Sequence, residues 1–322
     1  MSRIITINYL SHTRPEYSDL TFHYLSKIKN ENKAKIKLNI LASVNNDWIR
    51  RCSKLNGIEC NIHIINGGGN NYIQKLKIAL STDTEYSIKL DEDCFINNYI
   101  WDYIIENVNV LDNDDNLLIS PIMSNNIPSC DLFINNGIKD KATIDKIHAE
   151  FLKRKMPDGL WGVNYESLDE FTIKAKKWDY KSFYNAVDKL STQTKGIHPV
   201  RICGEAQIMV NEYILDNIDI LNDKKEYSFI EFDSPYFTNS LFVMKTKIWL
   251  DIVNKKVDSF DEISLNNYKR NHNKKILYID NGFGTHLMFN TIYGNKNRWG
   301  IGIENGAQVE KQFYHKLKSK IL

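Results

Sequence analysis

The sequence predicts an α/β fold whose centre is a doubly wound, mostly parallel sheet. Short runs rich in β-branched residues alternate with segments of about ten residues that carry apolar side chains at helical spacing, the pattern of parallel sheets. Three consecutive acids, Asp91, Glu92 and Asp93, end the fourth of the β-like runs. Because ligands bind beyond the carboxyl ends of the strands in such sheets, we expect a ligand site at these acids.

The predicted strands and helices follow one another most regularly before residue 120. The segments at residues 3–9 and 86–90 are short and mostly apolar, as expected of buried strands. The predicted strands are 3–9, 34–44, 58–65, 86–90, 117–120, 236–244 and 276–280. The predicted helices are 16–29, 48–55, 71–80, 97–108, 144–155, 166–190, 204–215, 245–253, a helix opened by a capping box at Ser259 and Glu262, and 308–320. A glycine-bearing loop, 281–286, is expected to end at His286.

The regular alternation weakens between residues 121 and 235. We therefore divide the chain into residues 1–120, a largely helical insertion at 121–235, and residues 236–322. The insertion is dense in aromatic side chains, which either pack on the sheet or form a platform for a ligand. Core packing is the commoner use of such side chains and is favoured here.

Composition limits the classes of protein to which the chain can belong. With 322 residues, 42% of them hydrophobic, it can bury one large core or two smaller ones. The net charge of +2 demands no polyanionic partner, and the lysines of the last segment fit a solvated helix face better than a nucleic-acid or membrane contact. Five scattered cysteines without a C-x-x-C pair predict reduced thiols in the cytoplasm. No run approaches 18 apolar residues, so we expect a soluble or peripheral protein without an integral membrane segment.

The acid triplet has the chemistry of a cation site. In an extended segment, residues i and i+2 project to the same side, so Asp91 and Asp93 are expected to face a ligand while Glu92 points away. Mn²⁺ and Mg²⁺ take oxygen ligands of this kind and bridge phosphate oxygens. His286 is a candidate nitrogen ligand, which Mn²⁺ accepts better than Mg²⁺. A loop histidine bonded only to backbone is the alternative interpretation.

In their order along the chain, these segments resemble the family 2 type of GT-A glycosyltransferase, which has a Rossmann-like sheet. The resemblance covers most of the chain outside the insertion. The matching segments are Tyr9 with Thr13-Arg14-Pro15, the strand from Glu85-Tyr86 to the D-x-D motif at Asp91–Asp93, residues 238–245, residues 260–265 with Tyr268-Lys269, and residues 276–286. A single D-x-D is a weak signal, whereas the ordered set is fairly specific.

The resemblance implies a nucleotide-diphosphate sugar donor, a divalent metal and inversion at the anomeric carbon. It makes residues 1–120 the nucleotide-sugar-binding half, the insertion an acceptor region, and residues 236–322 the acceptor and catalytic half. The implied site residues are Tyr9, Arg14, Asn45, Asp47, Lys75 and Asp91 for the donor, Asp91, Asp93 and His286 for the metal (Mn²⁺ or Mg²⁺), Asn239 and Ser240 for the acceptor, and Asp261 or Glu262 as the general base.

Several of these assignments have alternatives. The family usually has an acid after the second strand, where this chain has Val44-Asn45-Asn46-Asp47. Lys77 competes with Lys75 for the diphosphate, and a solvated helix face is the commoner role for either. Asp261 and Glu262 can also be acids that stabilise a helix N-terminus, and Glu205 is a rival base.

The acceptor is expected to be a glycan or polysaccharide precursor. The alternatives are a hydroxymethylated DNA base, as in some phage-encoded transferases, and a nucleotide-sugar binding module without turnover. Near-neutral charge disfavours strong duplex binding. A nucleotidyltransferase would need a glycine-rich basic loop after the first strand, which Ser11-His-Thr-Arg-Pro15 does not supply.

Overall fold

The structure is a computed structural model. It describes residues 3–12, 14–45, 47–65, 72–80, 84–126, 128–153, 204–232, 236–255, 262–288 and 306–322. The helix predicted at 166–190, the proposed N-cap Ser259 and the candidate base Asp261 lie outside the described residues.

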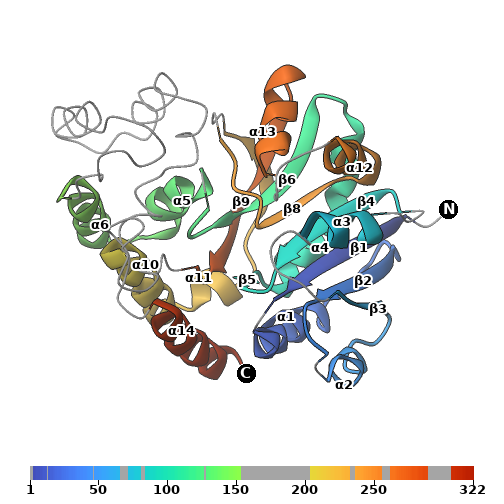
Figure 1. Ribbon diagram of the computed structural model, residues 1–322. Helices are drawn as coiled ribbons and strands as arrows, with labels where there is room; N and C mark the ends of the chain where they lie inside the picture. The colour runs from blue at the N-terminus through green and yellow to red at the C-terminus, as the bar shows by residue number, and fades with distance from the viewer. Residues whose placement is uncertain are drawn as a thin grey trace, which may run out of the picture.

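Within those ranges, one nine-stranded sheet forms the centre of the molecule (Figure 1). Its strand order is β3-β2-β1-β4-β8-β6-β9-β5, and β7 pairs with β9. The strands are β1 Ile4–Ser11, β2 Lys35–Ala42, β3 Glu59–Ile64, β4 Tyr86–Asp91, β5 Cys94–Phe95, β6 Asn116–Met123, β7 Ser228–Glu231, β8 Leu241–Lys245 and β9 Lys275–His286.

The sheet is mostly parallel, as predicted. β1 pairs in parallel with both β2 and β4, β2 with β3, and β6 with β9. β8 is antiparallel to its neighbours β4 and β6. Because β8 runs backwards between parallel strands, its first residues lie beside the last residues of β4, and Leu90 pairs with Leu241. Residues just before β8 therefore reach the edge where the acid triplet lies.

Helices cover both faces of the sheet, as a doubly wound fold requires (Figure 1). The helices are α1 Ser18–Leu25, α2 Trp48–Cys52, α3 Tyr72–Ala79, α4 Asn98–Asn107, α5 Ser129–Leu132, α6 Lys141–Lys153, α10 Gly204–Asp216, α11 Asp219–Asn222, α12 Thr246–Asn254, α13 Glu262–Asn271 and α14 Gly306–Ile321, with shorter turns at Pro15–Tyr17, Val108–Asp112 and Phe133–Gly137. Along β4, Ile88 and Leu90 join the apolar cluster of α1, α2 and α4. None of the helices in the described part of the chain is long and apolar enough to cross a membrane.

The predicted glycine loop at 281–286 is wrong, because β9 continues through it to His286. The register of β6 against β9 shifts between Pro121 and Ile122, where β9 bulges at residues 280–282. Asn281 has a φ of 59° in this bulge. Gly284, beyond this bulge, serves a close approach rather than a turn. A Cβ on Gly284 would lie 2.6 Å from Ile96 Cγ2, 2.7 Å from Met123 Sδ and 2.9 Å from the Phe95 carbonyl oxygen.

Gly284→Ala is expected to destabilise the protein by about 1–3 kcal/mol, because the added methyl group overpacks the contact between β9, β5 and β6. It should also displace His286, two residues further along β9. Unfolding in denaturant measures the first effect, and the stabilisation given by added Mn²⁺ measures the second. Gly57→Ala is the control, since Gly57 has a φ of +79° and open space around it. That variant should lose stability through backbone strain alone and keep its response to Mn²⁺; equal responses in both variants would contradict the expected displacement of His286.

Candidate functional site

The candidate site is built where β4, β5 and β9 meet. β4 ends at Asp91, residues 92 and 93 turn, and β5 begins at Cys94. Cys94 pairs with His286 of β9, and the backbone N–H of Leu287 donates to the Asp93 carbonyl oxygen at 2.9 Å. The acid triplet is thus a fixed turn between two strands and not the extended segment that the spacing predicted.

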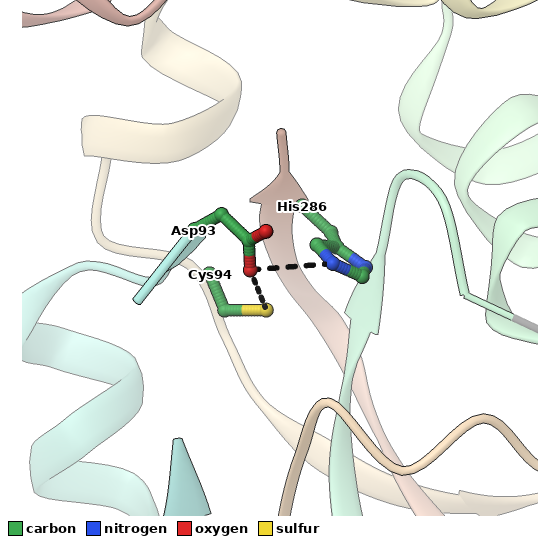
Figure 2. A group of neighbouring side chains, drawn as sticks. All are labelled: Asp93, Cys94 and His286. Atoms are coloured by element: carbon green, nitrogen blue, oxygen red, sulfur yellow. Dashed lines mark hydrogen bonds and ion pairs between the residues drawn. The ribbon is translucent and has the colours of Figure 1, made fainter. Parts of the chain in front are cut away.

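Asp93 lies at the centre of the site (Figure 2). Its Oδ1 is 3.4 Å from Nε2 of His286, and its Oδ2 accepts a hydrogen bond of 2.9 Å from Nη2 of Arg14. Burial would raise the pKa of Asp93, but His286 and Arg14 outweigh burial and lower it well below the usual value. Asp93 therefore presents a full negative charge in a nearly closed environment.

His286 is oriented by a residue that the sequence did not single out. Its Nδ1 lies 2.6 Å from Oδ1 of Asn126, and Asn126 in turn donates through Nδ2 to the Ser240 hydroxyl. An amide oxygen only accepts, so Nδ1 carries a proton, and Nε2 is the ring nitrogen that faces Asp93. Metal-ligating histidines are commonly fixed through their second nitrogen in this way. The predicted alternative, a loop histidine bonded only to backbone, does not describe this side chain.

Glu92 ties down the N-terminal loop. It is 3% exposed and accepts hydrogen bonds from the Ser11 hydroxyl, the backbone N–H groups of His12 and Arg14, and Nε of Arg14. Arg14 also bonds Glu310 of α14. One guanidinium thus joins three carboxylates, those of Glu92, Asp93 and Glu310.

Asp91, a predicted donor and metal residue, pairs with a buried lysine. Nζ of Lys89 lies 2.9 Å from Oδ1 and 3.0 Å from Oδ2 of Asp91. Burial raises the pKa of Asp91 to about 6, Lys89 opposes the rise, and Asp93 adds to it. The backbone N–H of Asp91 donates to the Ser240 carbonyl oxygen at 3.0 Å, which joins the acid to the start of β8.

The raised pKa of Asp91 predicts a stability change with pH. The folded protein binds this proton more tightly than the unfolded chain, so the stabilisation is complete below 3.8, the ordinary pKa of an aspartate, and is lost as pH rises through about 6. Relative to Asp91→Asn, wild type should lose up to about 3 kcal/mol of unfolding free energy across that range. Denaturant unfolding at a series of pH values, without added metal, measures the difference. Asp114→Asn, at an exposed turn, should show no such trend; a pH-independent difference for Asp91→Asn would contradict the assignment.

The other predicted donor residues have different surroundings. Lys75 is 7% exposed and donates through Nζ to the Ser43 hydroxyl at 2.7 Å, while burial lowers its pKa and Glu92 opposes that effect. Asn45 and Asp47 are exposed beyond the carboxyl end of β2, where Asp47 pairs with Arg50. A donor contact by Tyr9 does not fit the structure, because its side chain is 0% exposed and packs near Phe22 and Trp48.

The predicted base and acceptor residues are joined to one another. Glu262, the first residue of α13, accepts from the Tyr236 hydroxyl and, at 3.2 Å, from the backbone N–H of Asn239. Asn239 is followed by Ser240, which bonds Asp91 and Asn126 as described above. The segment before β8 thus connects Glu262 to the acid turn.

The group Asp93, Cys94 and His286 fits a metal ion by its geometry. One ligand atom from each residue lies within 4.8 Å of the other two, and all three residues are buried. Asp91 is not a member of this group, and Cys94 was not predicted to be one. The signal that could have indicated Cys94 is its place directly after the acids.

Comparisons with known proteins give a distant and partial structural match. No protein-family profile and no curated protein matches the chain. Among solved structures, the chain is similar to glucosyl-3-phosphoglycerate synthase from Mycobacterium tuberculosis in complex with phosphoglyceric acid, with 14% identity and a TM-score of 0.29. The match covers 38% of this chain and 44% of that one, less than half of either.

Proposed function

We propose that the protein is a glycosyltransferase that moves a sugar from a nucleotide-diphosphate donor to a hydroxyl group of a glycan or polysaccharide precursor, with inversion and with a divalent cation such as Mn²⁺ or Mg²⁺. The observation that carries the proposal is the buried pair of Asp93 and His286 beyond the end of β4. The carboxylate is ionised, and Nε2 of the imidazole faces it at 3.4 Å. This edge of the sheet is where doubly wound folds bind their ligands.

The donor half of the reaction needs positive charge, because a nucleoside diphosphate leaves with two or more negative charges. When bound at Asp93 and His286, the cation would offset that charge. Lys75, next to Ser43 beyond β2, is the protein's own cation for the diphosphate in this proposal. Arg14 contributes by fixing Asp93 and the turn.

The acceptor half needs a base on the face of the sugar opposite the leaving group. Glu262 fits this role in the proposal, because Tyr236 and Asn239 fix its two oxygens while each oxygen keeps a second lone pair. Asp261 remains its alternative. Inversion follows when the deprotonated hydroxyl attacks the anomeric carbon directly and the diphosphate departs from the other face.

A thermal-shift screen of nucleoside diphosphates, each with and without Mn²⁺, tests the donor. We expect one nucleoside diphosphate to raise the melting temperature, and to do so only when Mn²⁺ is present. At a ligand concentration a hundredfold above its Kd, the folded state should gain about 2.7 kcal/mol of stability. Lys75→Gln should weaken this response, and Lys77→Gln is the matched control because Lys77 is exposed on the same helix. Absence of any cation-dependent response to every nucleotide would overturn the proposed donor class.

A further inference from the structure

We propose that Cys94 is a third protein ligand of the cation, so that the site prefers a thiophilic metal such as Zn²⁺ or Co²⁺ over Mg²⁺. This inference rests on the proposed function, in which a cation binds at Asp93 and His286. It goes beyond it by assigning a sulfur ligand and hence a class of metal. Thiolate ligands select against Mg²⁺, which takes oxygen.

The turn between β4 and β5 is what brings two adjacent side chains to one point. In a continuous strand, Asp93 and Cys94 would project to opposite faces of the sheet. Here β4 stops at Asp91, and the turn at residues 92 and 93 rotates the chain before β5 begins. Figure 2 shows dashed lines from one oxygen of Asp93 to the thiol of Cys94 and to the ring of His286.

The two distances from Asp93 are close to those between ligands of one small metal ion. Oδ1 of Asp93 is 3.4 Å from Nε2 of His286 and 3.9 Å from Sγ of Cys94. Bonds of about 2.0–2.1 Å to oxygen and nitrogen and about 2.3 Å to sulfur give ligand separations of roughly 3.4–3.6 Å in a tetrahedral site. The thiol and the His286 ring lie within 4.8 Å of each other, so a shift of up to about an ångström would complete the set.

The backbone pairing and the burial of Asp93, Cys94 and His286 keep their side chains close together. Cys94 and His286 are direct partners in the antiparallel pair of β5 and β9. Cys94 is 1% exposed, His286 3% and Asp93 7%. Asn126 fixes the imidazole tautomer that offers Nε2. With three protein ligands, a tetrahedral ion keeps a fourth position for a donor oxygen, the arrangement of catalytic rather than structural zinc sites.

Titration of the metal-free protein with Co²⁺ tests the sulfur ligand by absorption. We expect visible d–d bands together with a near-ultraviolet band from sulfur-to-cobalt charge transfer. Cys94→Ser should lose the near-ultraviolet band and bind Co²⁺ at least about tenfold more weakly. Cys130→Ser is the control, because Cys130 is equally buried but lies on α5 outside the group.

The spectrum of the wild-type protein can contradict the sulfur ligand even if Cys94→Ser does not fold. Visible bands without the charge-transfer band would overturn the role of Cys94 while leaving a cation site at Asp93 and His286. No cobalt bands at all would overturn the inference and the cation of the proposed function together. A charge-transfer band that persists in Cys94→Ser would also overturn the assignment.

Discussion

Asp93→Asn is expected to lower cation-dependent sugar transfer by at least about 10²–10³-fold, the usual effect of removing one strong electrostatic contact from an active site. The amide keeps the shape of the side chain but removes the charge that pairs with His286 and Arg14. A neutral amide is also a weaker ligand for a hard cation. The rate of nucleoside diphosphate release from sugar derivatives of the nucleotide that the screen identifies, with Mn²⁺ present, measures the loss.

The matched control for Asp93→Asn is Asp114→Asn, the same exchange at an exposed turn. It should retain the wild-type rate. If Asp93→Asn instead raised the KM for the cation and left turnover at saturating Mn²⁺ unchanged, Asp93 would bind the ion without stabilising the transition state. Unchanged rate and unchanged cation dependence would remove Asp93 from the site.

The parallel core could be predicted because its signals are local. The strands β1 and β4 and the helix between residues 98 and 107 are each recognisable within one window of sequence, and Asn97 caps that helix through the backbone N–H of Ile100 at 2.9 Å. Alternation of such windows restricts the sheet to few topologies. The acids at the end of β4 then predict a ligand site at that edge of the sheet.

The support around the acids could not be predicted, because it depends on residues far apart in sequence. Asn126 lies in a segment that has the composition of an ordinary polar turn, and its bond to His286 spans 160 residues. The reversed direction of β8 has no local signature either, although it carries Ser240 to Asp91. Glycine at 284 indicated a loop locally, whereas the packing of β5 and β6 decides its role.

Arg14→Met is expected to destabilise the protein by about 3–5 kcal/mol, because it leaves buried carboxylates without their cation. Glu92 is 3% exposed on its side chain, and Asp93 and Glu310 are each 10% exposed. Glu310 is also one of the contacts that join α14 to the N-terminal loop, beside the stacked rings of Tyr17 and Tyr314, whose centroids are 4.0 Å apart. Methionine keeps the apolar stem of the side chain, so the loss reports the charge and the hydrogen bonds of the guanidinium. Denaturant unfolding measures it.

Two further variants distinguish electrostatics from packing at this position. Arg50→Met, which removes an exposed arginine paired with Asp47, should change stability by less than about 1 kcal/mol. Adding Glu310→Gln to Arg14→Met removes one of the unpaired charges, so the double variant should be more stable than Arg14→Met alone. The double variant could instead lose the sum of the stability losses of Arg14→Met and Glu310→Gln. In that case Glu310 acts through the packing of α14, and the three carboxylates do not share one cation. Recovery of stability would mean that the carboxylates of Glu92, Asp93 and Glu310 repel one another when Arg14 is absent. In the metal-free protein, Arg14 would then be what allows the site to hold three acids.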